Sequence, residues 1–478
     1  MNPEDDTILR SKYAWSLIPA RGRPKRDAAL RVLDYNEIYA NYDERTVREQ
    51  AARCIQCPDA LCAQACPLSN RIPEWLALAA EGRFVEASRV SHATSNMPEI
   101  CSRVCPQERL CEGACILNCR TDPVSIGAIE CFINEYTFDH GPEDITPAAP
   151  NGRRVAVIGS GPAGMACSDE LSKLGYAVTL FESMSLPGGL LVNGIPSFKL
   201  EKRVVARRLG VLAKRGVELR LGVTVGRDLP LGEVARTHDA VFLGHGAQKA
   251  KAAGIPGEGL AGVEQALPFL IQKNAGPGVV TGREIDVRGR SVAVLGGGDT
   301  AMDCLRTALR AGARAATCIY RRDFLNMPGS RKEYANALEE GATFQFLTNP
   351  VEIMGGERGG VGRIRCARME LGAPDASGRL RPRAIPGSEF TVDADVAIIA
   401  YGFDPVAFPE DSEFSRIRVN EWGGIVVDAD QMTTVPKVYA GGDSVRGPSL
   451  VVHAVRDGRK AALAIHRKIG PAGNAAES

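Results

Sequence analysis

Arg154-Val-Ala-Val-Ile-Gly-Ser-Gly-Pro-Ala-Gly164 is the segment that decides the fold expected for most of this 478-residue chain. Four apolar residues run into glycines at G-x-G-x-x-G spacing, a pattern typical of a buried strand that turns into a helix. Gly159 permits the tight turn, Gly161 lets a diphosphate approach the backbone, and Gly164 allows close helix packing. The segment therefore predicts a Rossmann-like nucleotide-binding unit.

The next apolar run identifies the nucleotide. Ala177-Val-Thr-Leu-Phe-Glu182 ends in a carboxylate, at about the 20-residue offset expected for a side chain that binds ribose hydroxyls. A carboxylate at this place would repel a 2′-phosphate. Glu182 therefore indicates that the first unit binds FAD or NAD.

A second segment, Ser291-Val-Ala-Val-Leu-Gly-Gly-Gly-Asp-Thr-Ala301, repeats the pattern with alanine in the third slot. Its candidate nucleotide-binding residues are Gly296, Gly298, Asp299 and Thr300. The following predicted strand, 316–320, ends in Arg321-Arg322. Guanidinium groups bind a phosphate dianion bidentately, so this pair favours NADPH over NADH. The alternative is a solvated arginine pair, since arginine is common on surfaces.

Ten of the 14 cysteines lie between Cys54 and Cys131. Two groups stand out, Cys54, Cys57, Cys62 and Cys66, followed by Cys101, Cys105, Cys111 and Cys115. Short spacings let thiolates converge on an iron–sulfur core, to which a distant cysteine adds a ligand. Structural zinc is the alternative, but zinc sites usually show two C-x2-C pairs, and only Cys54-Cys57 has that form.

Charge and motifs exclude several functions. Lys and Arg number 58 against 57 Asp and Glu, so a net charge of +1 attracts neither nucleic acid nor anionic membrane. The acidic N-terminus lacks a secretory signal, and no run reaches the ~18 apolar residues of a membrane span. We therefore expect a cytoplasmic protein with reduced thiols. No hydrolytic motif is present and no catalytic side chain is assigned, so cofactors must supply the chemistry.

The overall pattern predicts three parts. Ile72, Trp75, Leu76 and Ala79 recur at helical spacing in a front part without strand alternation, and an α/β pattern follows. We expect an α/β fold with two Rossmann-like domains, of the two-dinucleotide flavoprotein type, behind a helical iron–sulfur domain. The predicted boundaries are 1–150 for the iron–sulfur domain, 151–280 and 411–478 for the two parts of the FAD domain, and 281–410 for the NADPH domain.

These motifs carry a family resemblance over nearly the whole chain. Together with Arg109-Leu-Cys-Glu-Gly-Ala-Cys115, Pro187-Gly-Gly-Leu-Leu-Val-Asn-Gly-Ile-Pro196 and Ala440-Gly-Gly-Asp443, they resemble the small (beta) subunit of bacterial NADPH-dependent glutamate synthase. The same module resembles the N-terminal portion of dihydropyrimidine dehydrogenase. The resemblance implies FAD, NADPH, two 4Fe-4S clusters and a large (alpha) subunit as partner in a hetero-oligomer.

The resemblance also implies which residues bind the cofactors. Those assigned to FAD are Gly159, Gly161, Gly164, Glu182, Gly189, Leu190, Pro196, Gly442 and Asp443. Those assigned to NADPH are Gly296, Gly298, Asp299, Thr300, Arg321 and Arg322. One cluster takes Cys54, Cys57, Cys62 and Cys115, and the other takes Cys66, Cys105 and Cys111.

The fourth ligand of the second cluster has three candidates. A glutamine supplies it in the dihydropyrimidine dehydrogenase module, and Glu130 of Ile126-Gly-Ala-Ile-Glu130 occupies the matching place by resemblance. Cys101 would complete an all-cysteine set instead. Cys131 competes as well, but neighbours on a helix point about 100° apart, so only one of Glu130 and Cys131 can face the cluster.

The function implied by the resemblance is electron input to glutamate synthase. NADPH delivers two electrons as a hydride and a 4Fe-4S cluster takes one, so a flavin between them must divide the pair. One alternative is a flavin and iron–sulfur subunit that serves another acceptor, such as ferredoxin. A second is a cofactor scaffold without turnover. A thioredoxin-reductase-like enzyme would need a C-x-x-C in the second unit, where Cys304 has no second cysteine at that spacing.

Overall fold

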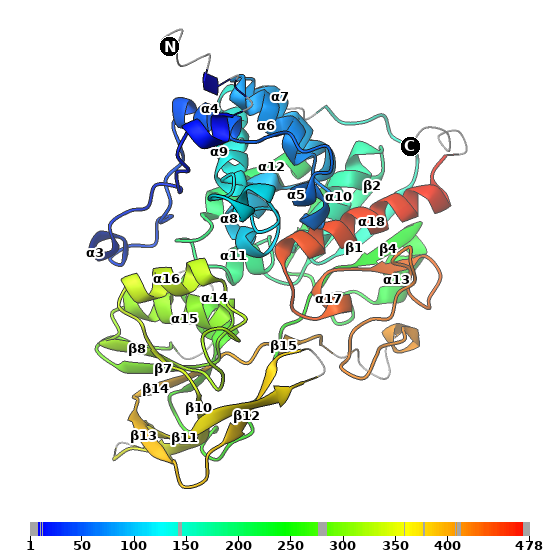
Figure 1. The fold of residues 1–478 in the computed structure, drawn as a ribbon. Coiled ribbons are helices and arrows are strands. Elements are labelled where there is room, and N and C mark those ends of the chain that lie inside the picture. The colour runs from blue at the N-terminus through cyan, green and yellow to red at the C-terminus, as the bar shows by residue number, and fades with distance from the viewer. Residues whose placement is uncertain are drawn as a thin grey trace.

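The computed structural model describes residues 8–9, 11, 13–141, 146–275, 284–357, 359–375, 378–406, 408 and 413–471. In these ranges the chain forms a helical N-terminal domain and two α/β units (Figure 1). The predicted boundaries at residues 280 and 410 lie outside the described residues. None of the described helices combines the length and hydrophobicity that crossing a membrane requires.

The N-terminal domain is a bundle of short helices. They are α2 (Ala14–Leu17), α3 (Ala28–Arg31), α4 (Glu44–Ala52), α5 (Leu61–Ala65), α6 (Ile72–Ala80), α7 (Phe84–Thr94), α8 (Pro98–Val104) and α9 (Ile126–His140), with the 3-10 turns η1 (Gln107–Arg109) and η2 (Ile116–Cys119). The residues predicted to share a helix face, Ile72, Trp75, Leu76 and Ala79, are all buried on α6. They pack with side chains of α7 and α9, which confirms the helical interpretation.

The first α/β unit is a parallel sheet with strand order β16-β4-β1-β2-β3. Its strands are β1 (Arg154–Ile158), β2 (Ala177–Glu182), β3 (Glu218–Leu221), β4 (Ala240–Leu243) and β16 (Val438–Ala440). Its helices are α10 (Pro162–Lys173), α11 (Leu190–Asn193), α12 (Lys202–Lys214), α13 (Leu231–Thr237), η3 (Glu413–Arg416), α17 (Asp443–Arg446) and α18 (Val451–Ile469). Because β16 and α18 follow the second unit in the sequence, two separated stretches of chain build this unit.

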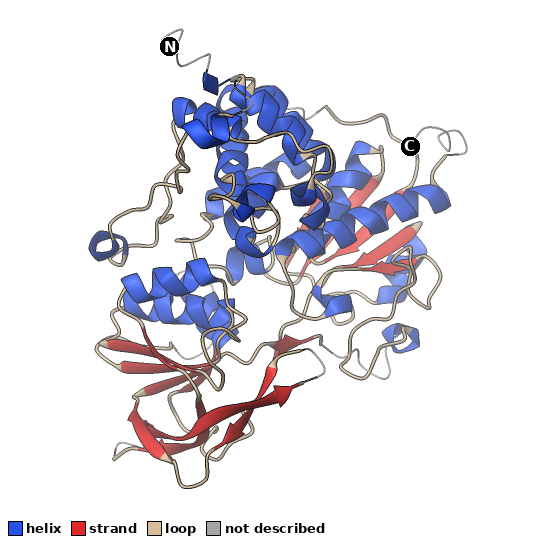
Figure 2. Ribbon diagram, in the orientation of Figure 1, coloured by secondary structure: helices blue, strands red, loops and turns tan. Residues whose placement is uncertain are grey.

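The second unit contains another parallel sheet, with order β6-β14-β7-β8-β9. Its elements are β6 (Val263–Gln265), α14 (Ala266–Ala275), β7 (Ser291–Leu295), α15 (Asp299–Arg310), β8 (Ala315–Ile319), α16 (Arg331–Glu339), β9 (Thr343–Gln345) and β14 (Val396–Ile399). An antiparallel sheet of β10 (Thr348–Gly355), β11 (Val361–Pro374), β12 (Leu380–Ala384) and β13 (Phe390–Asp393) lies beside it (Figure 2). The fold is therefore of the expected α/β, two-dinucleotide type.

The division between the two units differs from the predicted one. β6 and α14 precede residue 280, yet β6 pairs with β14 in the second sheet. The chain crosses between the units at β5 (Lys249–Ala250) and β15 (Phe403–Asp404), which pair antiparallel. Residues 151–280 therefore contain elements of both units, because strand pairing rather than sequence proximity decides the sheet.

Buried ion pairs join the N-terminal domain to both units. Arg208 on α12 donates to Glu99 on α8 at 2.7 Å. Arg31 on α3 donates to Glu340 at 2.8 Å, and Arg306 of α15 donates to the same carboxylate at 2.8 Å. All these side chains are almost fully buried. Removing one partner of such a pair leaves an uncompensated buried charge, so these contacts hold the three parts in one arrangement.

Candidate functional site

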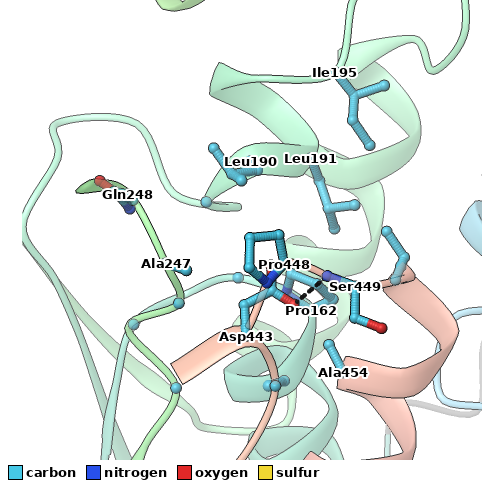
Figure 3. Close-up of a pocket in the computed structure, with 18 of the residues that line it drawn as sticks. Pro162, Leu190, Leu191, Ile195, Ala247, Gln248, Asp443, Pro448, Ser449 and Ala454 are labelled. Atoms are coloured by element: carbon cyan, nitrogen blue, oxygen red, sulfur yellow. Dashed lines mark hydrogen bonds between the residues drawn. The ribbon is translucent and has the colours of Figure 1, made fainter. Parts of the chain in front are cut away.

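A pocket of about 360 Å³ lies where the two α/β units and the N-terminal domain meet. The first glycine turn, the end of β2 and the starts of α17 and α18 form one side, and the start of α15 forms another. The N-terminal domain adds Cys105 and Pro106. Figure 3 shows Leu190, Leu191 and Asp443 around this space.

The first glycine turn has the close contacts that the motif predicts. Gly159 has a φ of 97°, and a Cβ there would lie 2.5 Å from the carbonyl oxygen of Gly244. A Cβ on Gly164 would lie 1.9 Å from the carbonyl oxygen of Gly159. Gly159 and Gly161 line the pocket, whereas Gly164 lies behind the turn. Because α10 begins at Pro162, its N-terminus opens on the pocket and suits a diphosphate.

Glu182 faces the pocket from the end of β2 and is tied to the glycine turn. Its carboxylate accepts hydrogen bonds from the Ser160 N–H at 3.0 Å and the Ser160 hydroxyl at 2.6 Å. The Met184 N–H donates to the other oxygen at 2.9 Å. Glu182 therefore braces the turn as well as presenting a carboxylate. Sequence reasoning did not single out Ser160, because it occupies a variable place in the motif.

Asp443 reaches the pocket from the start of α17, after Gly442, whose φ is 72°. It accepts a hydrogen bond from the Ser449 N–H at 3.1 Å (Figure 3). Burial raises the pKa of Asp443 to about 7, and the Ser449 hydrogen bond only partly offsets this effect. Such a carboxyl can serve as donor or acceptor toward hydroxyl groups of a ligand.

The loop after β2 supplies apolar contacts. Leu190, Leu191 and Ile195 line the pocket, together with Gly189, while the described pocket wall does not include Pro196. The ammonium of Lys202 donates to the carbonyls of Leu191, at 3.2 Å, and Ile195. This contact fixes the loop, whose apolar side chains form that side of the pocket.

His245 also lines the pocket. Burial lowers the pKa of His245 to about 4, and its ring packs edge-on against Phe408 with centroids 5.6 Å apart. The imidazole of His245 is therefore neutral near pH 7 and packed against an aromatic ring.

The second glycine turn opens on the same pocket. Asp299 and Thr300, at the start of α15, line it, while Gly296 and Gly298 lie behind them. Gly296 has a φ of 136°, and a Cβ there would lie 2.4 Å from the carbonyl oxygen of Ala400. Both predicted nucleotide turns therefore face one space.

Arg321 and Arg322 have different surroundings. Arg321 is exposed at the end of β8. Arg322 is only 5% exposed, forms an ion pair with Asp375 at 3.0 Å and donates to the Leu380 carbonyl at 2.8 Å. Arg321 is therefore accessible to a phosphate. Arg322 instead contacts the connection between β11 and β12 and the first residue of β12.

The cysteines surround two cavities in the N-terminal domain. The outer cavity is lined by Cys54, Cys57, Cys62 and Cys115. The inner cavity is lined by Cys66, Cys101, Cys105, Cys111 and Glu130. Ile126 lines both cavities, and Cys105 lines both the inner cavity and the nucleotide pocket. Cys131 points instead to Asn41, with its Sγ 3.4 Å from Oδ1.

Thiolate donors in these cavities fit iron–sulfur cores. Within the described part of the chain, no three Cys, His, Asp or Glu side chains converge tightly enough for a single metal ion. Burial raises the pKa of Cys54 to about 12 and that of Cys66 to about 11. Thiols this weakly acidic become thiolates when a metal binds, because coordination displaces the proton.

Glu130 is held in the inner cavity by two hydrogen bonds. Asn70 donates to its carboxylate at 3.0 Å, and the Ser91 hydroxyl donates at 2.9 Å. Cys101 also lines this cavity. The geometry therefore brings both candidate fourth ligands, Glu130 and Cys101, to the same place.

Comparisons with known families divide the chain in the same order. Residues 31–142 match the family described as dihydropyrimidine dehydrogenase domain II, 4Fe-4S cluster. Residues 153–458 match the family described as pyridine nucleotide-disulphide oxidoreductase. The match to a 4Fe-4S family favours iron–sulfur clusters over structural zinc for the cysteine groups.

Solved structures support the fold. FprA from Mycobacterium tuberculosis, in a complex with NADPH, superposes with a TM-score of 0.57 at 22% identity. The match covers 66% of this chain and 84% of that one. At this identity the likeness concerns the fold alone.

Curated relatives match nearly the whole chain. The glutamate synthase [NADPH] small chain of Azospirillum brasilense is 47% identical, covering 92% of this chain and 93% of the relative. The Escherichia coli small chain is 44% identical, covering 92% and 95%. The putative oxidoreductase AegA of Escherichia coli is 45% identical, covering 94% of this chain but 69% of the relative. The chain therefore belongs to the family of glutamate synthase [NADPH] small chains, and it is an NADPH-dependent oxidoreductase with FAD and 4Fe-4S cofactors.

Proposed function

We propose that this chain is the electron-input subunit of a glutamate synthase. It oxidises NADPH through FAD and passes electrons through two 4Fe-4S clusters to a large (alpha) subunit, which makes glutamate from glutamine and 2-oxoglutarate. The observation that carries this proposal is the position of Cys105, which lines both the nucleotide pocket and the inner cysteine cavity. We place the complex in the cytoplasm.

The first unit is the proposed FAD site. Gly159 and Gly161 would hold the diphosphate, Glu182 the ribose hydroxyls and Asp443 the ribitol. Leu190 and its neighbours would cover the isoalloxazine ring, which accepts a hydride and releases electrons singly when bound.

The second unit is the proposed NADPH site, with the turn at Gly296 and Gly298 and the side chains of Asp299 and Thr300. Hydride transfer requires donor and acceptor atoms roughly 3–3.5 Å apart. Because both turns open on one pocket, the two nucleotides can meet there. The loop held by Lys202 keeps water out of the contact.

The cysteine cavities supply a route away from the flavin. Cys105 borders the pocket and the inner cavity, and Ile126 separates the inner cavity from the outer one. Ile55, Leu61 and Ile116 line the outer cavity and are each more than 40% exposed. We therefore propose that electrons travel from the pocket through the inner cluster to the outer cluster, and leave at this apolar face.

The proposed ligands follow the two cavities. Cys54, Cys57, Cys62 and Cys115 hold the outer cluster, and Cys66, Cys105, Cys111 and Glu130 hold the inner one. Asn70 and Ser91 support this assignment, because they orient the Glu130 carboxylate within the inner cavity.

Reconstitution tests the subunit role. The isolated holo-chain is expected to oxidise NADPH with artificial electron acceptors and to form no glutamate. Addition of a large glutamate synthase subunit is expected to start glutamate formation from glutamine and 2-oxoglutarate. Glutamate formation by the isolated chain would contradict the proposal.

A second candidate is an oxidoreductase subunit for another acceptor. The AegA match favours it, because that relative carries this module within a longer chain that is not called a glutamate synthase. Reduction of ferredoxin by the NADPH-reduced chain, combined with failure to support any large subunit, would select this alternative.

A further inference from the structure

Lys332 is a partly buried cation in the pocket wall, and no ion pair joins it to any carboxylate in the described part of the chain. It follows the first residue of α16 and lines the nucleotide pocket. Its ammonium lies 4.2 Å from the centre of the Tyr39 ring. Among the described residues, no carboxylate lies within ion-pair distance of its Nζ. The neighbouring Glu333 is instead occupied by Arg306.

Lys199 provides the contrast within the same pocket. Its ammonium lies 2.8 Å from Asp303 and 3.8 Å from Glu333. Burial lowers the pKa of Lys332, whereas the carboxylates around Lys199 outweigh burial and raise its pKa. Glu333, Glu112 and Glu108 attract the Lys332 ammonium without forming an ion pair and do not offset its burial, so its charge is less well compensated than that of Lys199.

The backbone around Lys332 is docked on the second glycine turn. The Gly329 N–H donates to the Gly297 carbonyl at 3.0 Å. The Ser330 N–H donates to the Asp299 carboxylate at 2.9 Å. The backbone before Lys332 therefore lies beside the N-terminus of α15, which is the proposed diphosphate site, whereas Arg321 is exposed after the end of β8.

We propose that Lys332 binds the NADPH phosphate that is attached to the nicotinamide ribose. Arg321 then binds the 2′-phosphate at the adenosine end, so the two cations bind opposite ends of one nucleotide. Lys332 is a binding residue that the motif analysis did not find, because no fixed spacing links it to the glycine turn. The proposal rests on the proposed NADPH site in the second unit.

Nucleotide fragments distinguish binding at the nicotinamide end of NADPH from binding at the adenosine end. Adenosine 2′,5′-bisphosphate lacks the nicotinamide-side phosphate, whereas 2′-phospho-ADP-ribose and NADP⁺ retain it. Dissociation constants for all three are measured by calorimetry on the holo-chain and its variants. Lys332→Met is expected to weaken NADP⁺ and 2′-phospho-ADP-ribose about tenfold or more and to spare the bisphosphate. Lys332→Arg should restore part of the affinity, and Arg321→Ala should weaken all three ligands.

Stability without nucleotide gives a second readout. Lys332→Met is expected to change the thermal midpoint little, because it breaks no ion pair and removes a charge that burial disfavours. Lys199→Met, the matched control, should lower the midpoint because it leaves Asp303 unpaired.

Three results would overturn the role of Lys332. They are an unchanged NADP⁺ affinity, an equal loss for all three ligands, or a midpoint that falls as far as in Lys199→Met. If the unmodified holo-chain bound none of the ligands, the proposed NADPH site itself would fail, and this outcome differs from the other three.

Discussion

Arg321 and Arg322 are adjacent in the sequence, but only Arg321 is free to meet a ligand. Arg321→Ala is expected to raise the Michaelis constant for NADPH about tenfold, because a charge-assisted contact contributes roughly 1.5–3 kcal/mol. The constant for NADH should change little. Steady-state kinetics with an artificial acceptor measures both.

Arg322→Ala is the matched control for that prediction. It should lower thermal stability, because Asp375 and the Leu380 carbonyl each lose one hydrogen-bond donor, and it should keep the preference for NADPH. Loss of the preference in Arg322→Ala alone would show that Arg322 leaves Asp375 to bind the phosphate.

Glu130 and Cys101 both line the inner cavity, so single substitutions are needed to show which of them is the fourth cluster ligand. Glu130→Ala is expected to remove or alter the electron paramagnetic resonance signal of one cluster, because an oxygen ligand and its supporting hydrogen bonds are lost. Cys101→Ser should retain both signals. Cys131→Ser serves as the control, since its thiol faces Asn41. A cluster lost in Cys101→Ser and kept in Glu130→Ala would establish the all-cysteine set.

At the scale of elements, the two glycine turns tolerate different side chains in the third slot. In the first unit a Cβ on residue 164 would lie 1.9 Å from the Gly159 carbonyl oxygen, so Gly164→Ala must push α10 away from β1. We expect a loss of about 1–3 kcal/mol in stability and a lower FAD content. Flavin absorbance per protein measures the latter.

The second unit offers the matched control, because Ala301 is already fully buried in the corresponding slot. Ala301→Gly should cost about 1 kcal/mol through helix propensity and leave the FAD content unchanged. Equal flavin loss in both variants would show that general destabilisation, rather than the turn, releases FAD.

At the scale of the whole molecule, Glu340 links the N-terminal domain to the second unit. Burial alone would raise the pKa of Glu340, but hydrogen bonds from Arg306 and Arg310 outweigh it and lower the pKa to about 2. A depressed pKa stabilises the fold above the unfolded value near 4.5. This contribution, about 3 kcal/mol, is lost as pH falls from about 4.5 through 2.

Denaturant unfolding between pH 7 and 3 tests this coupling. The wild-type chain should lose stability most steeply below pH 4.5. Glu340→Gln should be less stable at pH 7, because Arg31 and Arg306 lose their buried partner, and should show a shallower acid slope. An unchanged slope would assign the acid sensitivity to other carboxylates.

The local motifs of this protein can be read directly from its sequence. A glycine turn and a short cysteine loop depend on residues close together in the chain, so Gly159, Gly296 and the cysteine groups could be recognised from spacing alone. The family resemblance then indicated which cofactors these motifs bind. The same locality explains why the helix face of α6 was predicted correctly.

How these motifs come together depends on the packing of distant segments, which the sequence does not reveal. Arg322 is engaged by Asp375, 53 residues later in the chain, and β6 joins a sheet whose other strands follow residue 280. The direction of Cys131 and the position of Lys332 in the pocket wall depend on packing between elements. Cys105 borders both the pocket and a cluster cavity for the same reason. The packing of the three parts creates these contacts between distant segments. Residues that meet in this way have no fixed spacing in the sequence, so no motif identifies them.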